Sequence, residues 1–324
     1  MRGEFDLIEK YFKRPARHAR LGVGDDCALI APEAGMELAV STDMLVEGTH
    51  FLAGADAYRL GHKTLAVNLS DLAAMGAAPR YAMLALALPG RDEAWLAAFA
   101  SGFFALAEAH AVELVGGDTT KGPLNVCVTI VGEVPAGRAI RRSGAQVGDD
   151  IWVSGTLGDA ALGLAHLQQR AALRADEAAH AVSCLEAPTP RVALGVALRG
   201  IATAMIDLSD GLAGDLRHLA EASGVDARVE AAVLPVGAPL ARMPLAQRLG
   251  FAIGGGDDYE LCFSAPSTAA EQVLETGARC GVAVTKIGRM VGRRGAAAAL
   301  VVADADGNPC ATTVSGYDHF KALA

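Results

Sequence analysis

The sequence predicts an α+β protein built from two domains of similar size. The chain has 324 residues, and a globular domain commonly holds roughly 150 residues, so two domains are expected. Segments with the two-residue period of strands are mixed with segments of helical period along the whole chain. A stretch rich in Gly, Arg and Asp at 136–150 separates the two halves. We therefore predict a first domain at 1–147 and a second at 148–324.

Composition and charge narrow the class of protein. Hydrophobic residues make up 52% of the chain and charged residues 20%, which is typical of a folded globular protein. The formal net charge is -9 and the basic residues form no large cluster, so the chain would repel a nucleic-acid backbone. No nucleic-acid partner is expected.

The cysteines and the apolar segments bear on the cellular compartment. The six cysteines are widely separated, without a C-x-x-C pair or a Cys/His spacing that suits zinc. We interpret them as reduced, mostly buried thiols. The opening MRGEFDLIEKYF lacks the apolar core of a signal peptide, and the chain has no uninterrupted apolar run of about 18 residues. No membrane partner is expected, and the predicted location is cytoplasmic.

The first half carries its polar residues at defined places in the expected elements. The β-type composition of 37–43 predicts a strand that ends in Ser, Thr and Asp. Apolar residues at helical spacing predict a helix over 56–75, which contains Asp71 and ends at Gly76. The other expected elements are a helix at 92–110 beginning near Asp92 and strands at 80–88, 112–115 and 124–134.

The second half alternates strands and helices again. IWVSG at 151–155 predicts a strand entering a glycine turn and a helix. The elements expected after it are helices at 158–170, near 190–199 and from about 211, a strand at 203–207, a strand and loop at 251–258, and then a strand, a helix and two strands.

Aspartate recurs in glycine-rich or polar segments. Glycine permits positive φ and close approach of the backbone, and a carboxylate offers the hard oxygen ligand that suits Mg²⁺. Any one such pair is common in ordinary turns, but their recurrence indicates loops for a metal-polyphosphate. The segments are GVGDD (22–26), STD (41–43), NLSDLAAMG (68–76), GGDTT (116–120), DLSDG (207–211) and GGGDDYE (254–260).

So many carboxylates around a triphosphate would repel one another unless divalent cations lay between them. The pattern therefore predicts several Mg²⁺ ions and a phosphoryl-transfer enzyme. The chain lacks G-x-x-x-x-G-K-[ST], the H-R-D and D-F-G motifs and a complete G-x-G-x-x-G. A P-loop, a protein kinase and a dinucleotide-binding fold are all disfavoured.

DLSDG lies where a strand is expected to pass into a helix. Asp207 and Asp210 are three positions apart, so both carboxylates could bind one metal ion, and the helix start offers unpaired N–H groups to phosphate. Helix capping by Ser209 or Asp210 explains the pair equally well.

Ten motifs, read in order, give the sequence a resemblance to a known family. It resembles the thiamine-monophosphate kinases, which belong with the aminoimidazole-ribonucleotide and selenophosphate synthetases. The resemblance implies their two-domain α+β fold, with a mixed, partly antiparallel amino-terminal sheet, ATP bound without a P-loop, and a homodimer formed through the amino-terminal sheets. The motifs are EFDLIEKYF, GVGDDCALI, STDMLVEGTHF, KTLAVNLSDLAAMGAAP, GGDTTKGP, RRSGAQVGD, SGTLGDAA, IDLSDGLAGDL, GGDDYELCF and GYDHF.

The same motifs imply roles for individual residues. Asp43, Asp71 and Asp210 are implied to act at the reacting phosphates. The implied magnesium ligands are Asp26, Ser41, Thr42, Asp43, Asp71, Asp118, Asp207 and Asp210. The implied ATP contacts are Gly117, Asp118, Arg142 and Ser209, and the implied substrate contacts are His50, Asp257 and Tyr317.

Three of these assignments keep an alternative or depart from the family. Arg141 lies beside Arg142 and could make the phosphate contact instead. Asp257 stands where the family commonly has glutamate, so its substrate contact could pass through water. His50 outside its motif would be an ordinary structural histidine. Tyr317 could place an aromatic face against a cationic thiazolium.

The implied reaction is ATP plus thiamine monophosphate giving thiamine diphosphate plus ADP, which completes the cofactor. A phosphate monoester has a second pKa of about 6, so the nucleophilic oxygen needs no strong general base, and direct in-line transfer is expected. The resemblance implies ATP as co-substrate and several Mg²⁺ ions, and it leaves a K⁺ requirement open. One alternative is another ATP-dependent member of the superfamily. The other is a non-catalytic binding protein, and the near-complete set of acidic motifs argues against this second alternative.

Overall fold

The computed structural model describes residues 4–24, 26–90 and 92–310. The chain forms two compact units, the first comprising Met1–Leu72 and Ala77–Gly137 and the second Ala73–Gly76 and Arg138–Ala324.

The second unit starts earlier in the sequence than the boundary predicted after residue 147. The segment before that position already bonds to elements of the second unit. The carbonyl of Arg141 accepts the N–H of Met205 at 3.0 Å, and the carbonyl of Arg142 accepts the hydroxyl of Ser223 at 2.9 Å. These bonds tie the Arg-rich segment to the second unit.

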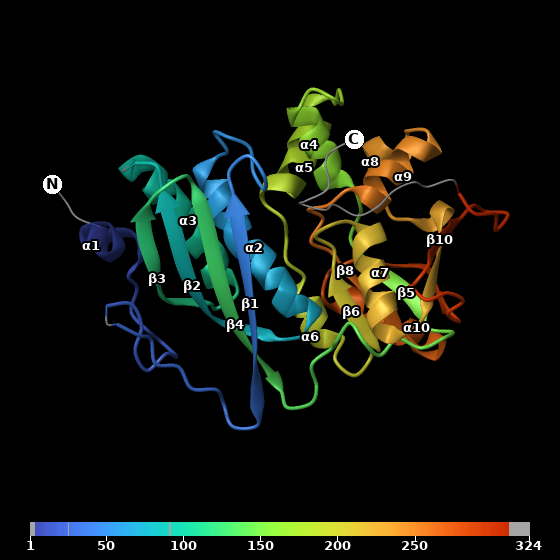
Figure 1. Cartoon of the computed structure of the whole chain (residues 1–324), viewed down its shortest axis with the longest axis horizontal. Coiled ribbons are helices and arrows are strands. Elements are labelled where there is room, and N and C mark those ends of the chain that lie inside the picture. The colour runs from blue at the N-terminus through green and yellow to red at the C-terminus, as the bar shows by residue number, and fades with distance from the viewer. Residues whose placement is uncertain (1–3, 25, 91, 311–324) are drawn as a thin grey trace. The chain divides into compact units, whose positions relative to one another are not determined.

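A four-stranded sheet with strand order β1-β4-β2-β3 forms the core of the first unit (Figure 1). β4 pairs antiparallel with both β1 and β2, whereas β2 and β3 are parallel. The strands and helices expected in this half are confirmed. Their bounds are α1 (Glu4–Leu7), a π-helical turn (Ile8–Phe12), β1 (Met36–Val46), α2 (Ala57–Ala74), β2 (Ala78–Leu88), α3 (Glu93–Ala109), β3 (Glu113–Lys121) and β4 (Asn125–Pro135).

The third strand differs from its expected length. A strand was predicted only over 112–115, with GGDTT in a loop, but β3 continues to Lys121. Pairing with β2 explains the difference, because residues 116–121 lie in register with 83–88 along a buried neighbour. Sheet pairing therefore extends the strand through a glycine-rich segment of low intrinsic β propensity.

Helices α2 and α3 cover one face of this sheet and pack closely against each other. α3 begins as expected, because the Asp92 carboxylate accepts the N–H groups of Ala94 and Trp95 at 3.0 and 3.1 Å. A Cβ at Gly102 would lie 1.9 Å from the carbonyl oxygen of Tyr58 in α2. Only glycine permits this separation of the two helix backbones.

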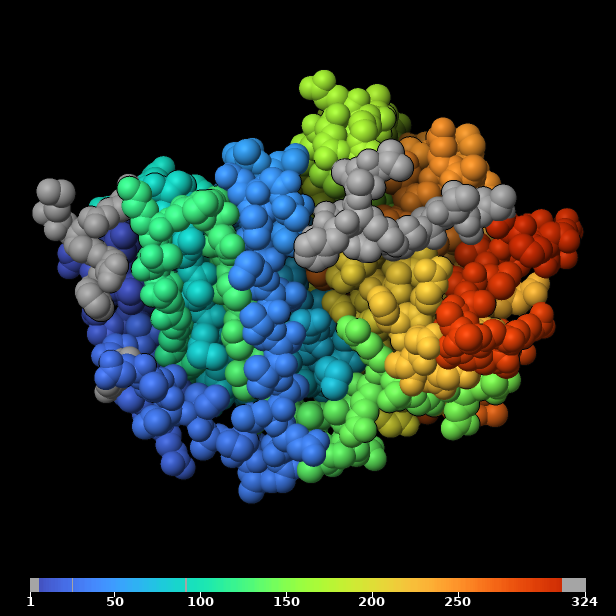
Figure 2. Space-filling view, viewed as in Figure 1, coloured from blue at the N-terminus to red at the C-terminus, as the bar shows by residue number. Residues whose placement is uncertain are grey.

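The opposite face of the sheet carries exposed apolar side chains. Alternation along β1 places Leu38, Val40 and Met44 on this face, and the pairing of Met83 with Thr129 and of Thr129 with Thr42 adds Met83. Val40 is 59% exposed and Met44 is 53% exposed. We call Leu38, Val40, Met44 and Met83 the outer apolar patch. Figure 2 shows the first unit in a space-filling view.

The second unit is built on a six-stranded sheet with the order β10-β7-β9-β5-β8-β6, in which only β10 and β7 are parallel. Its core combines this sheet with the apolar faces of α7 and α9. The bounds are β5 (Asp150–Ser154), α4 (Asp159–Leu167), α5 (Ala175–Glu186), α6 (Val192–Ala197), β6 (Ala204–Asp207), α7 (Leu212–Ser223), β7 (Asp226–Glu230), α8 (Ala238–Ala241), α9 (Leu245–Gly254), β8 (Leu261–Ala265), α10 (Ala270–Arg279), β9 (Val284–Val291) and β10 (Leu300–Ala303).

One sequence expectation for this unit and one for the whole chain were wrong. The segment at 251–258 is not a strand, because Leu249, Ala252 and Ile253 recur at helical spacing and pack α9 into the core. The cysteines are unpaired as expected but not mostly buried. Cys262 is buried, Cys27 is exposed, and the other four are intermediate. Among the described residues, no helix has the length and apolar content to cross a membrane.

The contact between α2 and α3 gives a test of the fold. We expect Gly102→Ala to lower the free energy of unfolding by about 1–3 kcal/mol, because the new methyl group must push two helix backbones apart. Urea denaturation followed by circular dichroism measures the change. Gly250→Ala is the matched control: it lies within α9 with no atom near a built Cβ, and should stabilise by about 0.5–1 kcal/mol. Equal stability of Gly102→Ala and the parent would contradict this account.

Candidate active site

The face of β1 that packs against α2 brings Ser41, Asp43 and Asp71 together. The hydroxyl of Ser41 donates a hydrogen bond to Oδ2 of Asp71, and the backbone N–H of Asp43 donates to Oδ1 of Asn68 at 3.2 Å. Asn68 and Asp71 are three positions apart in α2, so they share one face of the helix. The cluster offers two carboxylates and a hydroxyl, which are the oxygen ligands that Mg²⁺ prefers.

Thr42, also expected to bind metal, has its side chain on the other face of the sheet. Its hydroxyl bonds the hydroxyl of Thr129 on β4 at 2.8 Å. Because adjacent residues of a strand point to opposite faces, only the backbone of Thr42 can take part in the Ser41 cluster.

A second group of predicted residues lines a cavity of about 1070 Å³ in the first unit. Asp26, Gly117 and Asp118 all contribute to its wall, as does Lys13. Gly117 has φ +149°, and a Cβ there would lie 1.8 Å from the carbonyl oxygen of Leu84. A side chain at 117 would therefore separate β3 from β2 and move Asp118. Asp118 pairs with Ala85, Ala85 pairs with Cys127, and Cys127 pairs with Met44. Asp118 therefore lies on the same face of the sheet as Met44, and Asp43 lies on the opposite face.

The DLSD segment of the second unit groups three carboxylates. β6 ends at Asp207, and α7 begins after Gly211. The N–H of Asp210 donates to Oδ2 of Asp215, in the first turn of α7, at 3.0 Å. Burial, together with the charges of Asp207 and Asp210, raises the pKa of Asp215 to about 8. Three carboxylates this close are mutually unfavourable in the absence of a cation.

The segment from 255 to 260 pairs with the DLSD loop through its backbone. The N–H of Asp257 donates to the carbonyl of Ser209, and the N–H of Tyr259 donates to the carbonyl of Leu208, both at 2.8 Å. Asp257 and Tyr259 have φ of +68° and +48°, a conformation that costs about 1 kcal/mol or more for a residue other than glycine. Two of the predicted ligand contacts, Ser209 and Asp257, are thus held together.

A buried polar network, which the sequence reasoning missed, supports this loop. The guanidinium of Arg191 donates two hydrogen bonds to the carboxylate of Glu260, and the hydroxyl of Ser154 donates a third. The N–H of Gly158 donates to Asp258 at 2.9 Å. Desolvation raises the pKa of Asp258 well above its usual range. Nothing in the spacing of these residues along the chain indicates that they meet.

The remaining predicted residues differ in how the structure describes them. Nδ1 of His50 accepts the N–H of Val46 at 3.0 Å, which assigns the neutral ring as the Nε2–H tautomer. The positive charge of Arg142 lowers the pKa of Asp215, but burial and the neighbouring carboxylates have the larger effect and raise it. Tyr317 lies outside the described residues.

Within each unit, then, the structure gathers predicted residues that are far apart in sequence. The first unit contains the Ser41, Asp43 and Asp71 cluster and the cavity with Asp26, Gly117 and Asp118. The second contains a loop pair that holds the predicted residues Asp207, Ser209, Asp210 and Asp257.

The two units match models of one superfamily in order. Residues 24–134 match the AIR synthase related protein, N-terminal domain, and residues 146–300 match its C-terminal domain. Fold and carboxylate clusters thus define an AIR synthase-related protein, as the sequence motifs implied.

Comparison with known proteins specifies the family further. The thiamine-monophosphate kinase of Salmonella typhimurium is 48% identical over 324 residues, covering 98% of both chains. That of Stenotrophomonas maltophilia K279a has a solved structure with a TM-score of 0.84 and 44% identity, covering 94% of this chain and 96% of that one. The solved structure of AaThiL complexed with AMPPCP and TMP has a TM-score of 0.75 and 31% sequence identity. The match covers 90% of this chain and 89% of that one. The chain belongs to the thiamine-monophosphate kinase family.

The ion pair between Arg191 and Glu260 gives a second test. We expect Arg191→Met to destabilise the protein by about 3–5 kcal/mol, because it leaves Glu260 buried without a cation. The double substitution Arg191→Met with Glu260→Met should recover much of that loss, since no unpaired charge then remains. Urea denaturation measures both. Arg170→Met, which removes an exposed guanidinium bonded to Gln168, serves as control, and a double variant no more stable than Arg191→Met would refute the argument.

Proposed function

We propose that this chain transfers the γ-phosphoryl group of ATP to the phosphate of thiamine monophosphate, producing thiamine diphosphate and ADP. The observation that carries the proposal is the full-length relationship to thiamine-monophosphate kinases, at 48% identity over 98% of both chains. A more distant member of the family, AaThiL, has been solved in complex with AMPPCP and TMP, which supports ATP and thiamine monophosphate as the two substrates.

The proposal includes several Mg²⁺ ions, and the donor sets of the chain suit them. Asp43, Asp71 and the hydroxyl of Ser41 would form one set, and Asp207 with Asp210 a second. The crowding of the latter pair with Asp215 supports a cation there, because it leaves negative charge uncompensated. Asp26 and Asp118, on the cavity of the first unit, are the remaining proposed ligands. When bound, Mg²⁺ would neutralise charge on the transferring phosphates.

In this proposal the protein groups bind and orient the phosphates of the two substrates. The attacking phosphate oxygen is already largely ionised near neutral pH, so the proposal assigns no general base. Arg142 and the N–H groups at the start of α7 would hold phosphate oxygens, with Gly117 and Ser209 as further ATP contacts. Direct transfer follows, because a positioned phosphate needs no covalent enzyme intermediate.

The substrate contacts proposed for this chain are His50, Asp257 and Tyr317. The Nε2–H tautomer makes His50 a hydrogen-bond donor, which suits a phosphate oxygen or a pyrimidine nitrogen. Asp257 would accept from the substrate directly or through water. The role of Tyr317 and a K⁺ requirement stay predictions from the family.

The proposal further places the enzyme in the cytoplasm as a homodimer. Six unpaired cysteines and the use of ATP support a reducing compartment. The outer apolar patch supports association through the sheet of the first unit, because four exposed apolar side chains on one sheet face favour burial against a partner.

The activity can be tested directly. Purified protein given thiamine monophosphate, ATP and Mg²⁺ should form thiamine diphosphate, measured by chromatography, and EDTA should abolish it. Asp71→Asn and Asp210→Asn should each lower kcat by about 100-fold or more, because each removes a charge that acts at the transferring phosphates. Asp176→Asn, a change at a carboxylate that is 76% exposed on α5, should leave kcat unchanged.

Failure would also be informative. Saturable ATP binding without formation of thiamine diphosphate would reject the kinase and favour the substrate of another ATP-dependent member of the superfamily. A phosphorylated protein, formed with ATP alone and consumed by thiamine monophosphate, would reject direct transfer but keep the overall reaction.

The dimer has its own test. We expect Val40→Asp to weaken self-association at least about tenfold, because it places a charge in the centre of an apolar contact. Sedimentation equilibrium measures the dissociation constant. Val301→Asp, at a strand residue that is 36% exposed in the second unit, is the control. A monomeric parent protein, or equal association of the two variants, would exclude this interface.

A further inference from the structure

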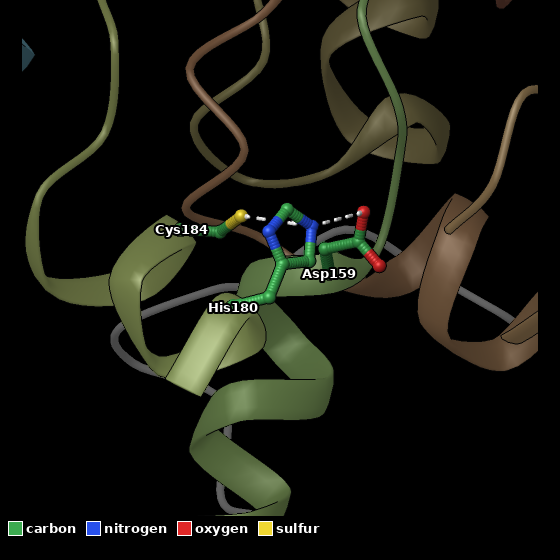
Figure 3. Close-up of side chains that lie close together, drawn as sticks. All are labelled: Asp159, His180 and Cys184. Atoms are coloured by element: carbon green, nitrogen blue, oxygen red, sulfur yellow. Dashed lines mark hydrogen bonds and ion pairs between the residues drawn. The ribbon is translucent and has the colours of Figure 1, made fainter. Parts of the chain in front are cut away.

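Three potential metal ligands of different chemistry meet where α4 and α5 pack in the second unit. Asp159 is the first residue of α4, and His180 and Cys184 lie on α5 (Figure 3). One ligand atom from each side chain lies within 4.8 Å of the other two. Nε2 of His180 is 3.7 Å from Oδ2 of Asp159 and 3.7 Å from Sγ of Cys184. None of the three belongs to the residues proposed for phosphoryl transfer.

We propose that Asp159, His180 and Cys184 form a binding site for one divalent cation of the zinc type. Tetrahedral zinc with ordinary bond lengths separates an imidazole nitrogen from a carboxylate oxygen by about 3.3 Å and from a thiolate sulfur by about 3.6 Å. Both observed separations are 3.7 Å. The third separation, between the Asp159 carboxylate and Sγ of Cys184, is at most 4.8 Å. Side-chain rotations would bring the three ligand atoms to the ion, and the fourth position would hold water.

The local sequence explains two of the three ligands. His180 and Cys184 are four positions apart in α5, so both project from one face of the helix. Ala181 and Leu185, one position after each ligand, are buried and fix the rotation of α5. The sequence was not expected to hold zinc, because this single His-x-x-x-Cys pair supplies only two ligands. The third ligand comes from a segment that is distant in sequence, and only the packing of α4 on α5 supplies it.

The carboxylate of Asp159 carries an independent sign of a missing partner. The residue is only 2% exposed. Its Oδ2 accepts the hydroxyl of Thr156 at 2.7 Å, but Oδ1 is one of two buried side-chain atoms, among the described residues, without a hydrogen-bond partner. An unsatisfied carboxylate oxygen in the interior is costly. A cation bound through both carboxylate oxygens would satisfy Oδ1, while Oδ2, which faces His180, keeps the bond from Thr156.

The same three residue types also occur in nucleophilic triads, and the geometry argues against that reading. In a triad the imidazole uses one nitrogen for the thiol and the other for the carboxylate. Here the single nitrogen Nε2 faces both. Burial and the charge of Asp159 also raise the pKa of the Cys184 thiol to about 11, which is opposite to the activation of a nucleophile.

The surrounding charge favours a cation. Asp159, Asp258 and Glu260 all act on Cys184, and Arg191, which is paired with Glu260, is the cation that opposes them. A thiol with a raised pKa must lose its proton when it binds metal. Binding of the ion therefore releases the thiol proton to solvent. His180, whose side chain is 60% exposed, leaves a path from solvent.

The ligand set also separates this site from the carboxylate clusters. Mg²⁺ selects oxygen ligands, whereas thiolate and imidazole select zinc and its transition-metal neighbours. Co²⁺ is therefore a suitable probe, because a cobalt–thiolate bond adds a charge-transfer band that carboxylate-bound cobalt lacks.

The experiment is a Co²⁺ titration of the full-length chain with saturating Mg²⁺ present and without ATP or thiamine monophosphate. The expected result is a thiolate-to-cobalt band that saturates at one ion per chain and is lost when Zn²⁺ is added. Cys184→Ser should abolish the band. His180→Ala should weaken Co²⁺ binding by about 10–100-fold or more. Removal of a residue that only hydrogen-bonds to a metal ligand already costs that much affinity. Cys280→Ser, at a second half-buried cysteine, should change neither.

Absence of the band in the parent protein would overturn the proposal, and this result needs no variant to fold. A band that persists in Cys184→Ser would overturn it as well. Thermal unfolding gives a second measurement: Zn²⁺ should raise the Tm of the parent and of Cys280→Ser, but not that of His180→Ala. Equal shifts in all three would reject the site. These results do not depend on kinase activity, so failure of the kinase proposal would be seen separately.

Discussion

Repulsion between carboxylates is the constraint on which the arrangement of this protein depends. The fold places acidic groups beside one another in the Ser41 cluster, at the DLSD loop, and within the loop at 255–260. Each place relieves the repulsion differently. Glu260 forms an ion pair with the guanidinium of Arg191. Asp258 accepts a hydrogen bond from the N–H of Gly158, and its pKa is raised. Asp215 has the N–H of Asp210 and a pKa of about 8. Cations would complete the two clusters proposed to act on phosphate.

Residues whose position depends on local periodicity were predictable from the sequence. The strand at 37–43 and the helix at 56–75 were placed correctly, and these two elements alone bring Ser41 and Asp43 to the face that meets Asp71. The junction at DLSDG was also correct, because a buried strand ending in aspartate and a helix beginning after glycine leave clear signals. Two-residue and 3.6-residue periods are properties of short segments, so short segments suffice to detect them.

Residues whose position depends on packing were not predictable. The helical α9 was read as a strand because its apolar run is short, and a short run fits both periods until its neighbours are known. Arg191 and Glu260 are far apart in sequence, and the pairing of Asp159 with α5 depends on how two helices pack. The side of the sheet on which Thr42 and Asp118 lie follows from strand register, which the sequence does not state.

The loop at 255–260 has a consequence for protein engineering. Asp257 and Tyr259 hold left-handed backbone conformations that glycine would adopt without strain. A procedure that ranks substitutions by folding energy alone would therefore select glycine at both positions, and would gain stability by deleting a proposed substrate contact. The proposed role of Asp257 would thus set thermostability against recognition in this loop, so design of a more robust variant should hold Asp257 fixed.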